Sequence, residues 1–203
     1  MCGLYIDGIH FTETTGDVVS IIKCADVLIQ NCEFSYSSGA NGLNISKTDA
    51  EIICCKAHHN NNDGFNMHNY GNTVFRNCDG YSNTVGDGLS HHEYCTGIVD
   101  GGEWYGNGKA GISTPTYGAI VHIYNAYCHN NVIGIQVFNG DTGPATGHPE
   151  TKVIVGGCVA VSNDYAITIS DYAVIAMNCV FAGSRFQNIK LANDGTITQY
   201  PSA

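Results

Sequence analysis

The sequence predicts an all-β protein with one domain, residues 1–203, folded as a parallel β-helix of about eight rungs with a period of about 23 residues. The first reason is a duplicated segment: Asp63–Tyr70 reads DGFNMHNY, and Asp87–Tyr94 reads DGLSHHEY 24 residues later. The second is a glycine-apolar step that recurs at a similar spacing, and the third is a column of small residues in register with it. A repeat of this period is typical of a solenoid, in which each unit packs on its neighbours.

The glycine-apolar steps mark the successive rungs. They stand at Gly42-Leu43, Gly64-Phe65, Gly88-Leu89, Gly111-Ile112 and Gly134-Ile135, with looser versions at Asp17-Val18, Ala166-Ile167 and Asn188-Ile189. The steps are 22 to 25 residues apart, except for one interval of 32 residues. That interval contains residues 139–150, with the Gly- and Pro-rich run DTGPATGHP, which we expect to be an inserted loop beside a binding groove.

Two further columns keep the same register. The small residues are Cys32, Cys55, Cys78, Gly102, Ala126, Cys158 and Cys179, and the asparagines are Asn60, Asn83, Asn107, Asn130 and Asn163. Between these columns, apolar residues alternate with polar ones, as at Val27 and Ile29 and again at Leu43 and Ile45, which predicts short strands with one buried face. Asn and Gly between the strands predict tight turns with left-handed backbone. Rungs spaced like paired strands give a solenoid on the order of 35–40 Å long.

Composition argues against nucleic acid as a partner. Only 13% of the residues are charged and the formal net charge is −10, whereas a phosphate backbone is bound by Lys and Arg. The polar surface must instead consist of Asn, Ser, Thr, Tyr and Gly, which suits a hydroxyl-rich ligand.

The termini carry no sign of a targeting segment. Residues 1–23 lack a basic region followed by an apolar run, and no stretch approaches 18 consecutive apolar residues, so we expect neither a signal peptide nor a membrane span. The inward pattern already begins at Leu4 and Ile6, which leaves nothing to cap the first rung. We therefore expect a module of a longer protein or of an oligomer, such as a homotrimer, whose neighbours or flanking domains cover the ends.

The ten cysteines predict buried thiols rather than a disulfide framework. Cys32, Cys55 and Cys78 share one inward position, where a thiol acts as a small apolar side chain. The chain has no Cys-x-x-Cys pair, which disfavours structural zinc. Free thiols fit synthesis in a reducing cytoplasm.

The repeat, with its inward aliphatic pairs, Asn-Cys turns and Asn-Asp-Gly or Gly-Asp-Gly steps, resembles the right-handed parallel β-helix superfamily of pectate-lyase-like proteins. That superfamily includes polysaccharide lyases, glycosidases, alginate epimerases and phage tailspike depolymerases, and the resemblance runs from about Leu4 to Leu191. It implies a right-handed helix, the usual hand of parallel crossovers, and a polysaccharide as the partner. It also implies an extracellular or virion-associated location.

The duplicated segment predicts the site, because equivalent positions of successive rungs lie side by side. Alternation from the inward Leu89 directs Ser90 and His92 outward, and it aligns His91 with the inward Met67. We expect one outward strip that carries an acid, an imidazole and an aromatic ring on each of two rungs, with Asp63 beside Asp87, His68 beside His92 and Tyr70 beside Tyr94. We expect four catalytic residues: Asp63, Asp87, His68 and His92. We expect six residues to bind substrate: Tyr70, Tyr94, Tyr117, Asn66, Ser90 and Trp104.

Two chemistries fit this strip. Paired carboxylates raise one another's pKa, so Asp63 and Asp87 could be the acid and the base or nucleophile of a glycoside hydrolase. His92 or His68 could instead remove the proton beside a uronate carboxylate, with a tyrosine as the acid, as a lyase or epimerase requires. The run DGLSHHE also resembles the DGxDPHE signature of alginate epimerases. His92 matches its catalytic His, but Ser90 and His91 replace its Asp and Pro.

A non-catalytic reading remains open beside these. Asp-Gly is a common turn pair, in which the carboxylate caps backbone N–H groups, and a receptor-binding or adhesive solenoid would copy such turns along its length. We expect no cofactor, with calcium as a weak alternative, and no metal site from His68, His92 and Glu93, because their spacing matches no known ligand set.

Overall fold

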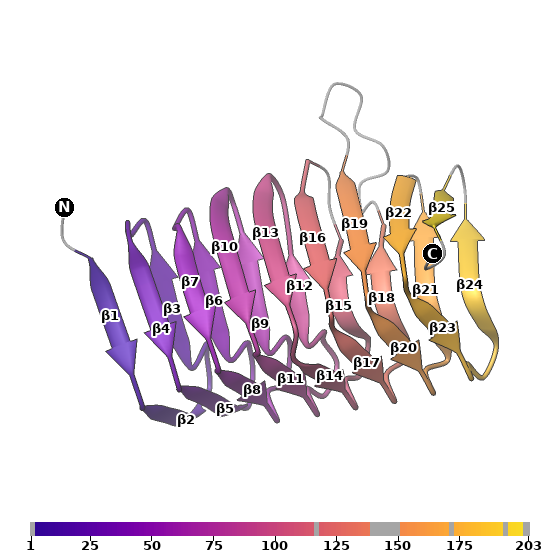
Figure 1. Ribbon diagram of the computed structural model, residues 1–203. Helices are drawn as coiled ribbons and strands as arrows, with labels where there is room; N and C mark the ends of the chain where they lie inside the picture. Colours follow the sequence, from indigo (N-terminus) through magenta and orange to yellow (C-terminus); the bar gives the residue numbers. More distant parts are fainter. Residues whose placement is uncertain (1–2, 116–117, 139–150, 171–172, 193–194, 201–203) are drawn as a thin grey trace.

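The computed structural model describes residues 3–115, 118–138, 151–170, 173–192 and 195–200. All regular structure in this part of the chain is β-strand, and the strands form three parallel sheets that run the length of the molecule (Figure 1). The chain visits the first, second and third sheet in turn and then repeats the circuit. The predicted parallel β-helix of about eight turns is therefore confirmed.

The strands of each sheet follow one another along the helix axis. The first sheet consists of β1 (Leu4–Asp7), β4 (Val27–Gln30), β7 (Ala50–Ile53), β10 (Gly71–Arg76), β13 (Cys95–Asp100), β16 (Ile120–Tyr124), β19 (Lys152–Gly156), β22 (Ala173–Met177) and β25 (Thr196–Tyr200). The second consists of β2 (His10–Thr14), β5 (Glu33–Ser37), β8 (Lys56–His58), β11 (Asp79–Tyr81), β14 (Glu103–Tyr105), β17 (Tyr127–His129), β20 (Val159–Val161) and β23 (Val180–Ala182). The third consists of β3 (Val19–Ile22), β6 (Leu43–Ser46), β9 (Phe65–His68), β12 (Leu89–His91), β15 (Ala110–Thr114), β18 (Ile133–Val137), β21 (Tyr165–Ser170) and β24 (Gln187–Ala192).

Strand register reproduces the sequence period. Phe65 pairs with Leu89 and Leu89 with Ile112, so the glycine-apolar steps are adjacent rungs. Ile135 pairs with Ile167 across the long interval, so the register of the rungs continues there. The predicted inserted loop, residues 139–150, lies outside the described residues.

The core lies between the three sheets. Along each strand, every second side chain points inward and contributes to it. Its largest fully buried members are aromatic and aliphatic residues: Trp104, Phe34, Phe65, Phe75, Ile29, Leu43 and Ile45. Cys32, Cys55 and Cys78 are buried free thiols, as predicted, and each of the last two accepts the backbone N–H of the preceding member through its sulfur. These cysteines lie where the chain turns from the first sheet to the second. A thiol is small enough to be buried beside such a sharp turn.

An asparagine ladder holds the corner between the second and third sheets. Each side-chain amide donates to the Oδ1 atom of the next, at 2.9–3.2 Å, through Asn60, Asn83, Asn107, Asn131 and Asn163. The predicted column is correct at four positions and wrong at Asn130, which is exposed with a φ of 55°. The corner buries the following residue, Asn131, because Asn130 takes the left-handed turn position.

None of the described residues forms a helix of the length and apolarity that crossing a membrane requires. The first strands of the sheets, β1, β2 and β3, lie at one end of the solenoid (Figure 1). That a trimer or a flanking domain covers the ends stays a prediction.

Candidate functional site

A column of polar side chains runs along the outward face of the third sheet. Strand register places one member on each rung, and we call this set the polar column: Ser20, Asn44, Asn66, Ser90, Ser113, Gln136, Thr168 and Lys190. These residues alternate with the inward aliphatic residues, so the strand pleat alone turns them outward. The sequence-predicted Asn66 and Ser90 are neighbouring members of this column. Asn66 is half-buried, whereas Ser90 is only 1% exposed, so the outward direction of Ser90 does not by itself make it accessible to a ligand.

Two histidines lie beside the polar column on β9 and just after β12. The rings of His68 and His92 are 6.4 Å apart between centroids and inclined at 70°. His92 Nε2 is 2.9 Å from Ser90 Oγ, and His68 Nδ1 is 2.7 Å from the Asn69 amide nitrogen. His68 Nε2 is buried and has no hydrogen-bond partner. The predicted outward pair is therefore a neighbouring pair of imidazoles, one of which has an unused nitrogen.

The environment keeps His92 neutral. Burial lowers its pKa to about 4, and the neighbouring His68 and Lys109 act in the same direction against the opposing effect of Glu93. A neutral imidazole has one nitrogen with a free lone pair, so His92 has the form that a base requires, but its lowered pKa makes it a weak base until a negative charge binds beside it. The adjacent His91 points into the core and is fully buried, as its alignment with Met67 predicts.

The two aspartates of the duplicated segment lie under this face rather than on it. Asp63 is 6% exposed and Asp87 is 1% exposed. Asp63 Oδ1 accepts the backbone N–H of Asp87, and Asp87 Oδ1 accepts that of Ala110, both at 2.8 Å. Burial, with the charge of Asp87, raises the pKa of Asp63 to about 7, and burial raises that of Asp87 against the opposing Lys109. Each carboxylate thus caps the turn of the next rung, and the expected outward position of both aspartates is wrong.

Lys109 completes the site, and the sequence did not single it out. Its Nζ lies 3.5 Å from Asp87 Oδ2 and 5.1 Å from the centroid of the Phe138 ring, while its own side chain is 40% exposed. It stands one rung beyond Asp87, directly before β15. The sequence could have indicated Lys109 by the scarcity of cations, because the chain has only eight Lys and Arg residues and this one stands between Gly108 and Ala110.

The predicted aromatic residues differ in their placement. Tyr70 and Tyr94 occupy the turns from the third to the first sheet, and their rings stack 4.8 Å apart and almost parallel. The stack covers one face of each of the two rings. Tyr117 lies outside the described residues.

Trp104 does not reach the surface. It is 0% exposed, and its indole N–H donates to the Gly101 carbonyl at 3.3 Å. Alternation along β14 explains this position, because Glu103 and Tyr105 point outward and Trp104 between them points inward. The prediction that Trp104 contacts a sugar is therefore wrong.

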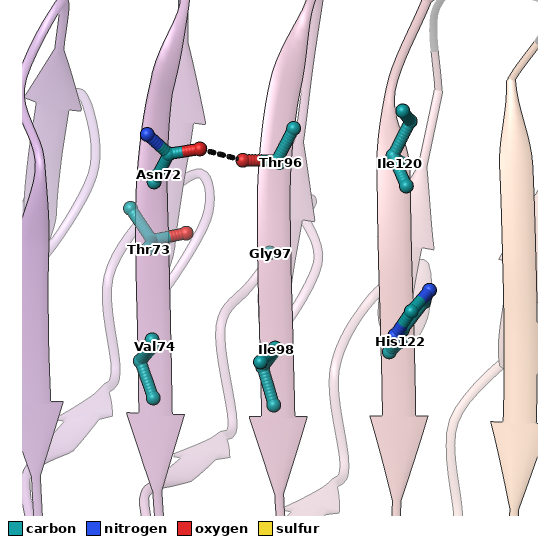
Figure 2. A pocket seen from close by; sticks show the side chains of 8 residues that line it. All are labelled: Asn72, Thr73, Val74, Thr96, Gly97, Ile98, Ile120 and His122. Carbon is teal, nitrogen blue, oxygen red and sulfur yellow. Dashed lines mark hydrogen bonds between the residues drawn. The ribbon is translucent and has the colours of Figure 1, made fainter.

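A hollow of about 260 Å³ lies on the outward face of the first sheet (Figure 2). Figure 2 shows Val74 and Ile98 side by side on β10 and β13, with Ile120 and His122 on the next strand. Asn72 accepts a hydrogen bond from Thr96 at its upper edge. The residues that line it include no carboxylate and no ammonium group. We therefore place the candidate site on the third sheet.

In the described part of the chain, no three His, Cys, Asp or Glu side chains are grouped as a metal site requires. The expectation of no cofactor, like the weak alternative of calcium, stays a prediction.

Comparison with known proteins gives matches over most of the chain. A family model described as a right-handed β-helix region matches residues 2–181. Pectate lyase L of Thermoclostridium stercorarium is 24% identical over 91% of this chain, which spans only 19% of that protein.

Two solved structures show the same fold. The A-module of the mannuronan C-5 epimerase AlgE4 from Azotobacter vinelandii has a TM-score of 0.53 and 20% identity over 89% of this chain and 65% of its own. An alginate lyase from Paenibacillus sp. has a TM-score of 0.52 and 13% identity over 94% of this chain and 78% of its own.

Proposed function

From the premise that the chain belongs to the right-handed β-helix family, we propose that it degrades a polysaccharide of uronic acids by β-elimination on the outward face of its third sheet. The observation that carries this proposal is the placement of a neutral imidazole, His92, and an ammonium group, Lys109, above one polar strand surface. The similar proteins support it, because pectate, alginate and mannuronan are all polymers of uronic acids. An extracellular or virion-associated location belongs to the same proposal.

In the proposed reaction, Lys109 stabilises negative charge and His92 acts as the general base. Lys109 pairs with the carboxylate of the sugar and stabilises the negative charge that develops when the neighbouring C5 loses its proton. The free lone pair of His92 takes that proton, and the bound carboxylate raises the pKa of His92 as it does so. The electron pair of the C5–H bond forms the C4–C5 double bond, and the C4–O bond breaks.

The leaving oxygen needs a proton, for which the tyrosine pair is the proposed source. Tyr94 follows His92 by two residues, and its half-buried ring stacks on that of the exposed Tyr70. Asn66 and His68 present an unpartnered Oδ1 and an unpartnered Nε2 beside this position, which we assign to sugar hydroxyl groups. In this scheme Asp87 acts on the reaction only through Lys109, which it holds at 3.5 Å.

Hydrolysis by Asp63 and Asp87 has less support. Its strongest feature is the raised pKa of Asp63, which leaves that carboxyl about half protonated at neutral pH. Both side chains, however, are buried and already accept backbone N–H groups, so a glycosidic oxygen cannot reach them in this arrangement. A purely adhesive role is favoured by one observation, the Ser90 that replaces the Asp of the epimerase-like motif.

One experiment separates the three functions. The protein is incubated with polygalacturonate, alginate and a neutral glucan, and both new reducing ends and the absorbance of an unsaturated uronate near ~235 nm are followed. We expect both signals with a uronate polymer and neither with the glucan. Reducing ends without the absorbance would identify a hydrolase. Binding without either signal would identify an adhesive module and contradict the proposal.

A further inference from the structure

The third sheet carries another hollow on its outward face, toward the C-terminal end of the solenoid. It has a volume of about 220 Å³ and is lined by residues of β18, β21 and β24 or directly after them. These strands follow β15 in the third sheet (Figure 1). The side chains that matter here are Gln136, Phe138, Tyr165, Thr168 and Lys190. Three of them belong to the polar column, so the hollow and the candidate site share one surface.

Unpartnered polar atoms gather along this surface. Among the described residues, four buried side-chain oxygen atoms of the polar column have no hydrogen-bond partner: Asn44 Oδ1, Asn66 Oδ1, Gln136 Oε1 and Thr168 Oγ1. Ser113 is left out of this set, because its hydroxyl interacts with the Asp87 carboxylate. Buried polar atoms are normally paired, so such a concentration requires an explanation. A hydroxyl-rich chain lying along the column, with small side-chain rotations, would supply the missing partners.

Lys190 gives the hollow a positive charge. Its Nζ lies 4.7 Å from the centroid of the Tyr165 ring, and among the described residues that line the hollow it alone is charged. The chain as a whole has a net charge of −10, so a cavity whose one charge is positive is a local exception. This charge selects an anion over a neutral sugar.

The hollow is also connected to the reacting position. Phe138 lines the hollow and at the same time lies beneath Lys109, the cation of the candidate site. Lys109 precedes β15 and Lys190 lies on β24, three rungs further on, which corresponds to roughly 14 Å along the axis. One extended polymer can therefore contact both ammonium groups, whereas a disaccharide held at Lys109 cannot reach the second.

We propose that the hollow of Gln136, Thr168 and Lys190 is a second subsite, which binds the carboxylate of a distant uronate residue while another residue of the same polymer lies over Lys109 and His92. The inference rests on the proposed function for its substrate class. The subsite also defines how the polymer lies on the protein, because a polymer that contacts both sites runs parallel to the solenoid axis along the polar column.

The test uses Lys190→Met, which removes the charge and keeps the length of the side chain. The matched control is Lys152→Met, an exposed lysine on the first sheet. Binding of the disaccharide and the octasaccharide of galacturonate and of mannuronate is measured by calorimetry at low salt. We expect Lys190→Met to bind the octasaccharide about tenfold more weakly, or about 1.4 kcal/mol, with disaccharide binding unchanged. Lys152→Met is expected to behave as the wild type.

Binding and turnover separate the failure of this subsite from the failure of the proposed function. Equal octasaccharide affinity in Lys190→Met and wild type would overturn the subsite even if the protein cleaves polyuronates. Equal losses for the disaccharide and the octasaccharide would also overturn it, because they would indicate a general structural effect. Selective loss of octasaccharide affinity in a protein that cleaves nothing would uphold the subsite and contradict the lyase. If the wild type binds neither uronate oligomer, both proposals are wrong.

Discussion

The sequence around Asp87 suggests a catalytic carboxylate, whereas its contacts are those of a structural one. Asp87 stands in the duplicated Asp-Gly pair, yet its Oδ1 accepts the N–H of Ala110 and it is almost fully buried. We expect Asp87→Ala to lower the free energy of unfolding by about 1–3 kcal/mol, because a buried N–H loses its partner. Urea unfolding measures this loss. Asp49→Ala is the control and should cost less, because Asp49 caps the Asn72 N–H at the exposed surface, where water can replace it.

The conservative variant Asp87→Asn distinguishes the two roles, since its amide oxygen can still cap Ala110. We expect it to retain most stability and measurable turnover. Abolished turnover with unchanged stability would instead restore the catalytic role that the sequence predicts for Asp87.

His91 should make the protein less stable in mild acid. It is fully buried, its Nε2 lies 2.9 Å from Thr73 Oγ1, and Gly97 leaves room for its ring. Burial lowers its pKa to about 3 from an ordinary value near 6.5. The unfolded chain therefore binds a proton that the native state does not, and the free energy of unfolding falls as the pH drops below 6.5. At pH 5 the contribution is about 2 kcal/mol.

Urea unfolding at pH 7 and pH 5 checks this expectation on the wild type and on His91→Met, which cannot take up the proton. Asp63 acts in the opposite direction, because its native pKa of about 7 lies above its ordinary value, so protonation stabilises the native state as the pH falls. Asp63 is present in both proteins, so its effect cancels in the comparison. An equal loss of stability in both proteins would contradict the role of His91.

The asparagine ladder is the element that holds successive corners together, and it allows a test on two adjacent residues. Asn131 donates to Trp104 O at 2.8 Å and to Asn163 Oδ1, and it accepts from Asn107, whereas its neighbour Asn130 is exposed. We expect Asn131→Ala to cost about 3 kcal/mol, since several buried partners lose their hydrogen bonds. Thermal or urea unfolding measures the difference.

Asn130→Gly is the control, because glycine tolerates the φ of 55° at this position. We expect a change within about 0.5 kcal/mol. A larger loss for Asn130→Gly than for Asn131→Ala would place the ladder on the residue that the sequence predicted.

The strands and their order were predictable, because a period of two within each strand and a period near 23 residues between rungs both follow from burial against stacked neighbours. The residues buried at the corners were less predictable. Asn130 and Asn131 show why, because either of two consecutive asparagines suits a turn. Alternation correctly placed His91 inward. The same rule applied to Glu103 and Tyr105 would have placed Trp104 inward as well.

The placement of the candidate site's side chains was predictable only in part, and their roles stay predictions. The duplicated segment correctly brought His68, His92 and Ser90 to one face. Lys109 was missed because it is not part of the duplication and joins the group only through its contacts with Asp87 and Phe138. A sequence column does not reveal how deep an outward side chain lies, which is why the aspartates were expected at the surface.

The whole molecule is expected to work without a bound metal ion, since the proposed scheme assigns charge stabilisation to Lys109. Turnover of a polyuronate should be the same, within about twofold, before and after treatment with a chelator followed by its removal. The measurement is the initial rate with and without added calcium. A rate that vanishes on chelation and returns with calcium alone would show that calcium takes part.

The central claim is that catalysis takes place on the outward face of the third sheet, with His92 as the base. The most direct measurement is the initial rate of unsaturated uronate formation by the wild type, His92→Gln and His122→Gln, the last being a matched control on the first sheet. We expect the rate to fall by at least about a hundredfold in His92→Gln while octasaccharide binding persists, and to be unchanged in His122→Gln. An undiminished rate in His92→Gln, or a loss confined to His122→Gln, would contradict the account.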